Sequence, residues 1–502
     1  MLILPPHPGP AHLDQLFIDP TQSYSAQISN AGSARARLRS VLKATRRDAQ
    51  SPNGADWTNA FKVLSRSAEW GAQAAANVGI NNLRQRADFL ALLALQATSE
   101  YLPYLHAILA CVESDDLILR SEPVFSWRSA LAAQVLRKSR PRIALPSLHY
   151  ELSCLLLTHA LCLSNRSATL VASLGSYETS ASVSSAELKT HDETINSAAE
   201  MLCRSSGILS HLAEVVLPRW EAAVGEATKG RPVELQSDVV TALSKLALAD
   251  ANLLAIRRLL SRSLALSHTL TTPGPPLPKS HPSPSLLAKL HLKVYHLYDS
   301  ARSLLKPYTS EISPDLRRYL SDGRLVAQSL SYKWLGVDAG ENGTREKAGD
   351  SIAWLLMAKS GFDEVKGKTE GVGRLKVGKG KVGKESKGKL AQEAESVKAF
   401  LSAYKRVNDS LHFQPIPSAA SLQLTVPSGI AALSAKLFTP PPPAFNPRPH
   451  DSTRPKIIPP PPPLDASFAG LNIDDDSSDE DEGPSAGGGN GDREYFGAGN
   501  YW

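Results

Sequence analysis

The chain has 502 residues, 42% of them hydrophobic and 21% charged, with a formal net charge of +6. This composition is ordinary for a folded protein, and the length suits one large domain with tails or several average domains. Much of the excess of positive over negative charge comes from one Lys/Gly tract, so the basic isoelectric point does not indicate nucleic-acid binding. The four cysteines form no CxxC pair, which favours buried free thiols over zinc or disulfides.

Helical periodicity dominates from about residue 57 to residue 362. Helices are expected over residues 57–77, 84–113, 125–139, 146–172, 190–224, 233–268, 284–307, 314–336 and 345–361. Ser283-Pro284 and Ser313-Pro314 each place an N-cap serine before a proline at the first helical position. Long helices in antiparallel succession predict stacked hairpins of the tetratricopeptide type. Within residues 11–30, HLDQLFID and SYSAQIS are compatible with short strands beside the helical body.

The C-terminal part of the chain has a different composition. Residues 366–389 alternate glycine with lysine and predict a mobile basic insertion, after which helix resumes at 390–411. Residues 436–502 are rich in proline, acidic residues and glycine, which predicts a disordered tail. The expected organisation is therefore a flexible N-terminus over 1–10, one domain over 11–435, and this tail. The tail is compatible with SH3-type partners or with a passive solubilising role.

The sequence offers no motif for catalysis, for a metal or for a cofactor. Gly373 to Lys379 satisfies GxxxxGK, but Gly380 stands where a phosphate-binding loop has Ser or Thr. His291 and His296 are five residues apart on one expected helix, so they face different directions. No GxSxG nucleophile motif occurs. We therefore expect a binding protein and not an enzyme, with no cofactor and no bound metal.

The expected helix around residues 285–305 has an apolar face wider than a surface helix needs. Leu287, Val294 and Tyr298 follow one line along this helix, and Leu286 and Leu290 follow a second line beside it. One interpretation is a central helix packed on two neighbours. The other is that part of the face is an exposed groove for a partner helix.

Several segments, taken in chain order, resemble the motifs of the Bro-domain family. They are YELSCLLLTHALCLSNRSA (150–168), LCRSSGILSHL (202–212), LADANLLAI (248–256), LLAKL (286–290) and GDSIAWL (349–355). The chain departs from the family at Thr158, where Asn is usual, and at Asp250 and Asn252, which replace two glutamines. The resemblance implies an all-α, boomerang-shaped domain with a tetratricopeptide-like core, a small β element near the N-terminus and a disordered C-terminal tail.

The resemblance also implies a binding site. Bro domains bind the C-terminal amphipathic helix of the main ESCRT-III filament subunit through an apolar patch on two consecutive helices. By motif position the patch here comprises Leu254, Ala255, Ile256, Leu286, Leu290 and Lys293. Ala255 stands where an animal member of the family has an exposed phenylalanine, and buried aromatics often anchor interfaces. A Leu290→Asp substitution is then expected to abolish binding and leave the fold intact.

The length and layout of the chain resemble those of fungal family members that act in ambient alkaline-pH signalling. This resemblance implies a non-enzymatic adaptor that binds ESCRT-III and promotes proteolytic activation of a zinc-finger transcription factor. The alternative is a general adaptor of endosomal, multivesicular-body sorting with no pH-specific role. The expected partners are the ESCRT-III filament subunit and components of the pH-signalling complex, with peripheral membrane association and no nucleic acid. The expected location is the cytoplasm, with recruitment to the cell cortex, plasma membrane or endosomes.

Overall fold

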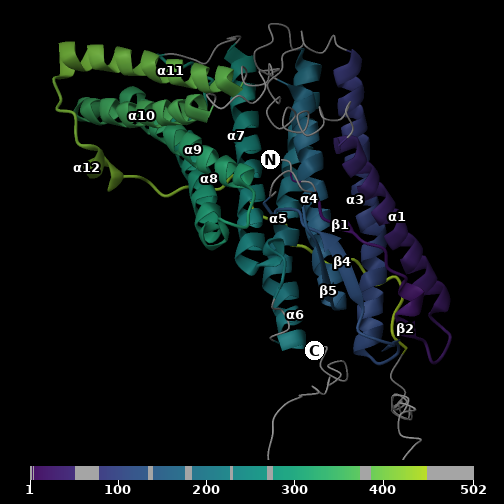
Figure 1. Cartoon of the computed structure of the whole chain (residues 1–502). Coiled ribbons are helices and arrows are strands. Elements are labelled where there is room, and N and C mark those ends of the chain that lie inside the picture. The colour runs from purple at the N-terminus through teal and green to yellow at the C-terminus, as the bar shows by residue number, and fades with distance from the viewer. Residues whose placement is uncertain are drawn as a thin grey trace, which may run out of the picture.

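The computed structural model describes residue 3 and residues 5–50, 78–133, 140–175, 184–225, 230–267, 275–372 and 386–448. The helices form a bent body with two arms, which has the shape of a boomerang (Figure 1). The long helices of the first arm are α1 (Ser25–Gln50), α3 (Val78–Glu113), α4 (Leu148–Leu174), α5 (Ser185–His211) and α7 (Ser237–Ser267). Those of the second arm are α8 (Pro284–Leu304), α9 (Pro314–Glu341), α10 (Ala348–Val372) and α11 (Ser386–Val407). The short helices are α6 (Leu217–Val224) and α12 (Ala419–Gln423).

Each long helix packs against the next one along the chain, from α1 and α3 through to α10 and α11. Neighbours in sequence are therefore neighbours in space, as in a helical solenoid. The predicted all-α, boomerang-shaped architecture of stacked hairpins is confirmed. The N-cap at Ser313 is present as well, because its side chain accepts a hydrogen bond from the backbone N–H of Asp315.

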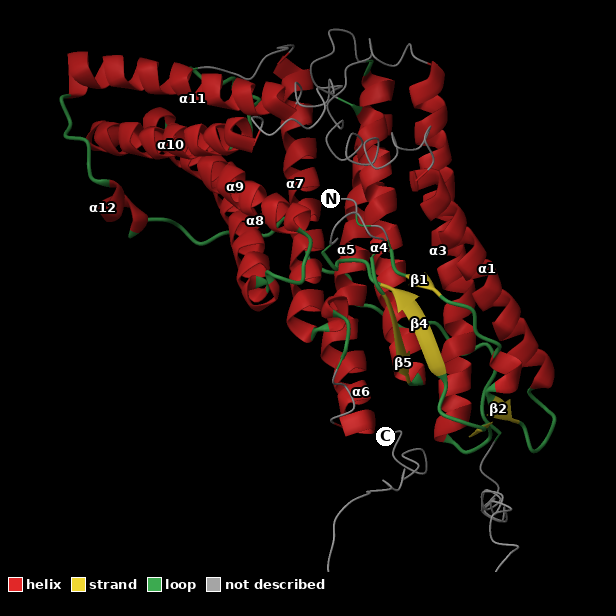
Figure 2. Ribbon diagram, viewed as in Figure 1, coloured by secondary structure: helices red, strands yellow, loops and turns green. Residues whose placement is uncertain are grey.

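Two small antiparallel sheets lie against the first arm (Figure 2). One has the order β1 (His7–Pro8), β4 (Val124–Arg128) and β5 (Arg142–Pro146), and the other pairs β2 (Phe17–Ile18) with β3 (Ile118–Leu119). The predicted β element near the N-terminus is thus confirmed, but the helix expected over 125–139 is wrong where the structure describes it. Along β4, Phe125 and Trp127 are buried while their neighbours face outward, which is the alternation of a strand.

Other boundaries differ from the expectation. SYSAQIS forms no strand, because α1 begins at Ser25. The helix α10 continues to Val372, into the segment expected to be a mobile insertion, and α11 begins at Ser386. The helix expected over 57–77 lies outside the described residues, as do residues 373–385 with the whole GxxxxGK sequence.

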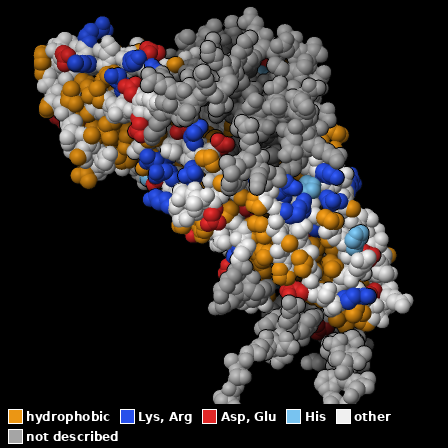
Figure 3. Space-filling view, viewed as in Figure 1, with side chains coloured by type: hydrophobic (Ala, Val, Ile, Leu, Met, Phe, Trp, Pro, Cys, Tyr) orange, Lys and Arg blue, Asp and Glu red, His pale blue; other side chains and the backbone are white. Residues whose placement is uncertain are grey.

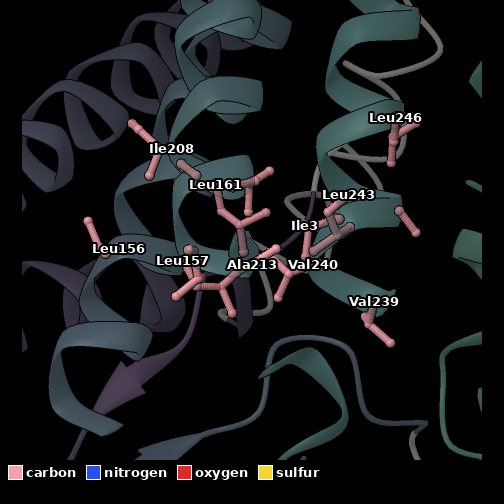
Figure 4. Close-up of a cluster of buried hydrophobic side chains, with 14 of the residues drawn as sticks. Ile3, Leu156, Leu157, Leu161, Ile208, Ala213, Val239, Val240, Leu243 and Leu246 are labelled. Atoms are coloured by element: carbon pink, nitrogen blue, oxygen red, sulfur yellow. The ribbon is translucent and has the colours of Figure 1, made fainter. Parts of the chain in front are cut away.

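The main hydrophobic core runs along the facing sides of α4, α5 and α7 (Figure 4). Leucines of α4 pack there against Ile208 of α5 and Val240 of α7, and Ile3 enters the same cluster from the N-terminus. The side chain of Asn165 on α4 holds Ile3 by two hydrogen bonds, one to its N–H (3.2 Å) and one to its C=O (2.8 Å). The core therefore extends to the first residues of the chain.

All four cysteines are buried free thiols, as predicted from their spacing. By length and composition alone, α7 over Ser237–Arg262 is apolar enough to cross a membrane, and 61% of this window is buried inside the fold. That burial is typical of a core helix, because α5 and α8 cover the apolar sides of α7.

A buried ion pair ties the β1-β4-β5 sheet to the helices. Arg35 of α1 and Glu151 of α4 are 2% and 0% exposed, and their side chains meet at 2.7 Å. Glu151 also accepts hydrogen bonds from Tyr101 Oη (3.3 Å) and Trp127 Nε1 (2.6 Å), and Arg35 Nη1 donates to Gly9 O (2.8 Å). Both carboxylate oxygens are therefore occupied, which a buried charge requires.

Candidate partner-binding surface on α7 and α8

The predicted site residues lie on α7 and α8, which pack side by side. The buried members are Leu254, Ile256 and Leu290, with exposed fractions of 9%, 2% and 6%. The more accessible members are Ala255 and Lys293, which are half-buried, and Leu286, which is 40% exposed. The structure thus brings the two helices together, but only part of the predicted set reaches the surface.

The burial of Leu290 changes the variant that tests this surface. Leu290 belongs to the main core together with Ile256. An aspartate there would place an unpaired charge among apolar side chains, which costs far more than losing a surface contact. The burial of Leu290 therefore argues against the expectation that Leu290→Asp leaves the fold intact, and Leu286 is the better position to change.

An extended segment, residues 424–448, crosses the molecule beside these residues; we call it the strap. It leaves α12 in the second arm and runs across α8, α7, α5 and α3 towards α1 (Figure 1). Its backbone bonds, in order, are Ile430 N to Lys289 O (3.0 Å), Lys436 N to Cys203 O (3.0 Å), Ala444 N to Pro103 O (3.1 Å) and Arg448 N to Asp116 Oδ2 (2.6 Å). The predicted domain boundary at residue 435 falls within this segment.

Asn252 of α7 holds the middle of the strap. Its Oδ1 accepts from the N–H groups of Ala432 (2.8 Å) and Leu433 (3.1 Å), and its Nδ2 donates to Leu433 O (3.2 Å). Asn252 is 1% exposed, and its Nδ2 also donates to Leu248 O (2.8 Å), so the strap satisfies chiefly the buried amide oxygen. Asn252 was noticed in the sequence only as a departure from the family motif, and no local pattern pairs it with a segment about 180 residues away.

The strap also borders the accessible part of α8. A Cβ placed on Gly429 would lie 2.6 Å from Lys293 N, so only glycine allows this close approach. The neighbouring Ile430 is 46% exposed and is bonded to α8 one turn beyond Leu286. We define the candidate surface as Ala255, Leu286, Lys293 and Ile430. Sequence reasoning missed Ile430, because nothing near it resembles a motif.

Two buried polar side chains, His291 of α8 and Lys333 of α9, lie within electrostatic reach of each other. His291 is 3% exposed, and its burial, assisted by the nearby Lys333, lowers its pKa to about 3. The ring is therefore neutral at physiological pH. The Lys333 ammonium is itself buried, pairs with Glu393 at 2.6 Å and lies 4.6 Å from the Trp334 ring centre. The Lys333–Glu393 pair therefore joins α9 to α11 next to the buried His291 of α8.

A cavity of about 170 Å³ lies between α4, α5 and α7, next to Ile3 and Leu254. Most of its lining is aliphatic. Its one carboxylate, Asp250 of α7, accepts hydrogen bonds from Tyr298 Oη (2.6 Å) and Tyr319 Oη (3.0 Å). Asp250 therefore joins α7 to α8 and α9. Within the part of the chain that the structure describes, no group of three His, Cys, Asp or Glu side chains is placed to hold a metal ion.

A family model described as the BRO1-like domain matches residues 48–452. The chain belongs to the BRO1-like domain family. The resemblance inferred from ordered motifs is therefore confirmed, and α7 and α8 are the helices of this Bro domain that carry the LADANLLAI and LLAKL motifs.

Curated relatives include two fungal proteins named pH-response regulator protein palC. The protein of Cryptococcus neoformans var. neoformans is 37% identical over 409 residues, covering 71% of this chain and 82% of the relative. The protein of Emericella nidulans is 27% identical over 427 residues, which cover 72% of this chain and 79% of the relative. In each comparison, the similarity thus covers most of this chain and most of the palC relative.

Solved Bro-domain structures have the same fold. ALIX in complex with the SIVmac239 PYKEVTEDL late domain matches with a TM-score of 0.53 and 15% identity over 89% of this chain, which spans 50% of that ALIX chain. The ALIX BRO1–CHMP4C complex matches with a TM-score of 0.51 and 16% identity, covering 88% of this chain and 95% of that one. A third structure, described as the structure basis for endosomal targeting by the Bro1 domain, matches with a TM-score of 0.51 and 13% identity. The match covers 86% of this chain and 91% of that one. Identities this low establish the fold and nothing further.

Proposed function

We propose that this chain is a non-enzymatic adaptor of ambient alkaline-pH signalling that binds the C-terminal helix of the ESCRT-III filament subunit. In this role it links that subunit to the pH-signalling complex at the cell cortex, plasma membrane or endosomes, and so promotes proteolytic activation of a zinc-finger transcription factor by a separate protease. The observation that carries the proposal is the 37% identity to a palC pH-response regulator over 409 residues.

The docking site in this proposal is the candidate surface. Leu286 and Ile430 supply exposed aliphatic groups, and Lys289 and Lys293 flank them on α8. An amphipathic helix lays its apolar side on such groups, and acidic residues at its edge then meet the lysines. The fold similarity to the ALIX BRO1 domain, which was solved as a complex with CHMP4C, supports a partner-binding role. Among the six predicted residues, Leu286 is the only large apolar side chain that is exposed, because Leu254, Ile256 and Leu290 are buried and Ala255 is small.

Leu286→Asp is expected to weaken binding of the ESCRT-III helix by about tenfold or more, which corresponds to ~1.4 kcal/mol per decade. A carboxylate at this position would have to be desolvated against the apolar side of the partner helix. The measurement is isothermal titration of the full chain with a synthetic peptide of the subunit's C-terminal helix. Since Leu286 is already 40% exposed, thermal unfolding of the variant should match the wild type.

Leu356→Asp is the matched control. Leu356 lies on α10 in the second arm and is 44% exposed, so it presents a similar leucine at a distance from the candidate surface. The control should bind the helix like the wild type. Retained binding by Leu286→Asp, with unchanged unfolding, would remove the surface assignment and leave the adaptor role to be tested separately.

A second candidate function is a general adaptor of endosomal, multivesicular-body sorting. It is supported by the similarity to a Bro1-domain structure titled for endosomal targeting. Growth at alkaline pH separates the two functions, because only a pH-signalling adaptor is required there. A deletion strain should fail to grow at alkaline pH and recover with the wild-type gene. Normal alkaline growth combined with missorted endosomal cargo would favour the second function.

A further inference from the structure

A row of basic residues crosses the β1-β4-β5 sheet, in which His7 is buried, Arg128 is half-buried and Arg142 is exposed. His7 is the cross-strand partner of Arg128, and Arg128 is the cross-strand partner of Arg142. Partners directly opposite in antiparallel strands project from the same face. Phe125 and Trp127 of β4 are buried, so the alternate positions, Arg128 included, point away from the core. Like charges directly opposite each other destabilise a sheet, and this sheet places two arginines in that relation.

The Arg142 side chain lies back across the sheet. Its Nη1 is 3.2 Å from Ser126 O and 3.3 Å from Ser126 Oγ, and its Nη2 is 3.3 Å from His7 Nδ1. A guanidinium only donates, so His7 Nδ1 accepts and carries no proton in this arrangement. A Cβ on Gly9 would come within 2.7 Å of Arg142 Nη1, so the glycine makes room for the guanidinium. The arginine is thus positioned by the sheet.

A third arginine completes the group from α1. Arg39 is half-buried, and its Nε is buried without a hydrogen-bond partner among the described residues. The pKa of Arg142 is lowered by burial first and then by the positive charges of Arg128 and Arg39. In the space-filling view, basic side chains gather with a histidine over the part of the face where β1 lies (Figure 3).

The cluster has no acidic counterpart in the described part of the chain. None of Arg39, Arg128 and Arg142 forms an ion pair with a carboxylate there. The nearby Glu151 is fully buried, and its oxygens are taken by Arg35, Tyr101 and Trp127. Among the described residues, no carboxylate therefore pairs with this cluster, at a place where the sheet itself orients the side chains.

We propose that Arg39, Arg128 and Arg142 form a binding site for a phosphate-bearing anion. A guanidinium group donates two parallel hydrogen bonds to phosphate oxygens. A doubly charged tetrahedral phosphate can therefore bind several arginines at once, which a single carboxylate does less well. Binding also relieves the repulsion between Arg128 and Arg142, so the anion stabilises the folded chain. A phosphorylated headgroup of a lipid and a free phosphorylated molecule share this chemistry.

The test is thermal unfolding of the full chain in inorganic phosphate and in sodium chloride of equal ionic strength. The wild type should show a melting temperature that rises with phosphate beyond the chloride value. The variant Arg128→Gln/Arg142→Gln should melt higher than the wild type in chloride and show no phosphate-specific rise. A phosphate response of equal size in the variant, or no response in the wild type, overturns the site.

The control variant, Arg317→Gln/Arg318→Gln, removes the same charge from exposed positions on α9. It should keep the phosphate response; loss of the response in this variant too would mean a general charge effect and would also overturn the site. Sedimentation with phosphatidylcholine vesicles, with and without phosphatidic acid, then identifies the source. Binding to phosphatidic acid vesicles that Arg128→Gln/Arg142→Gln weakens identifies a lipid headgroup. A phosphate response without such binding identifies a free phosphorylated ligand.

Discussion

Replacing Glu151 with alanine is expected to lower the free energy of unfolding by about 3–5 kcal/mol, the loss typical of breaking a buried ion pair from one side. The reason is the state of Arg35, which is 2% exposed and would keep its charge without a counter-charge. Tyr101 and Trp127 would also lose the acceptor of their hydrogen bonds. Chemical denaturation monitored by circular dichroism measures the change.

An exposed ion pair between α1 and α3 provides the comparison. Arg37 and Glu100 meet at 2.9 Å, but their side chains are 52% and 35% exposed. Glu100→Ala should therefore cost at most about 1 kcal/mol, as surface pairs do. A loss for Glu151→Ala as small as that for Glu100→Ala would mean that the buried pair contributes no more than a surface pair.

A variant without both charges shows how much of the stability loss comes from leaving one buried charge unpaired. Arg35→Met combined with Glu151→Leu leaves no unpaired charge in the core, so the double variant should lose less stability than Glu151→Ala alone. Part of the loss should remain, because Arg35 also donates to Gly9 O and thereby holds the sheet on α1. A double variant less stable than the single one would contradict this account.

Arg35 also explains why α1 was not predicted from the sequence. The buried positions of α1 include Ile28, Ala31, Leu38 and Leu42, which follow a helical spacing. The position that would continue the spacing between Ala31 and Leu38 is Arg35, a charged residue that a binary pattern counts as polar. The partner that makes this arginine tolerable, Glu151, is 116 residues away. The helices α4 and α8 bury polar residues too, among them Glu151 and His291, but their longer lines of leucines made them predictable from the same kind of pattern.

The candidate surface, too, was predictable only in part from local sequence patterns. Motif order located α7 and α8, because the apolar positions of these helices are local features of the sequence. The exposure of Leu286 and the burial of Leu290 were not predictable, since both leucines lie on one apolar line and only the neighbouring elements decide which is covered. The strap carries no periodic pattern, and its bonds join residues such as Asn252 and Ala432 that are 180 positions apart. Long-range pairing of this kind leaves no trace in a single sequence.

Gly207→Ala is expected to detach the strap from α5. A Cβ at Gly207 would collide with the backbone carbonyl of Lys436, which has no flexible end that can move aside. In the interior of an exposed helix, changing glycine to alanine normally stabilises by about 1 kcal/mol. At Gly207 the collision should reverse the sign, and the Lys436 amide, bonded to Cys203 O at 3.0 Å, should exchange its hydrogen faster.

The matched control is Gly32→Ala in α1, where no described atom lies within 4 Å of the added Cβ. This variant should gain stability by the ordinary helix preference, so the two substitutions should shift the melting temperature in opposite directions. Equal stabilisation of both, with the Lys436 amide still protected, would show that the strap does not press on α5. Gly207→Ala leaves Leu286 unchanged, so a loss of helix binding in this variant would come from the displaced strap and would assign Ile430 a part in the docking surface.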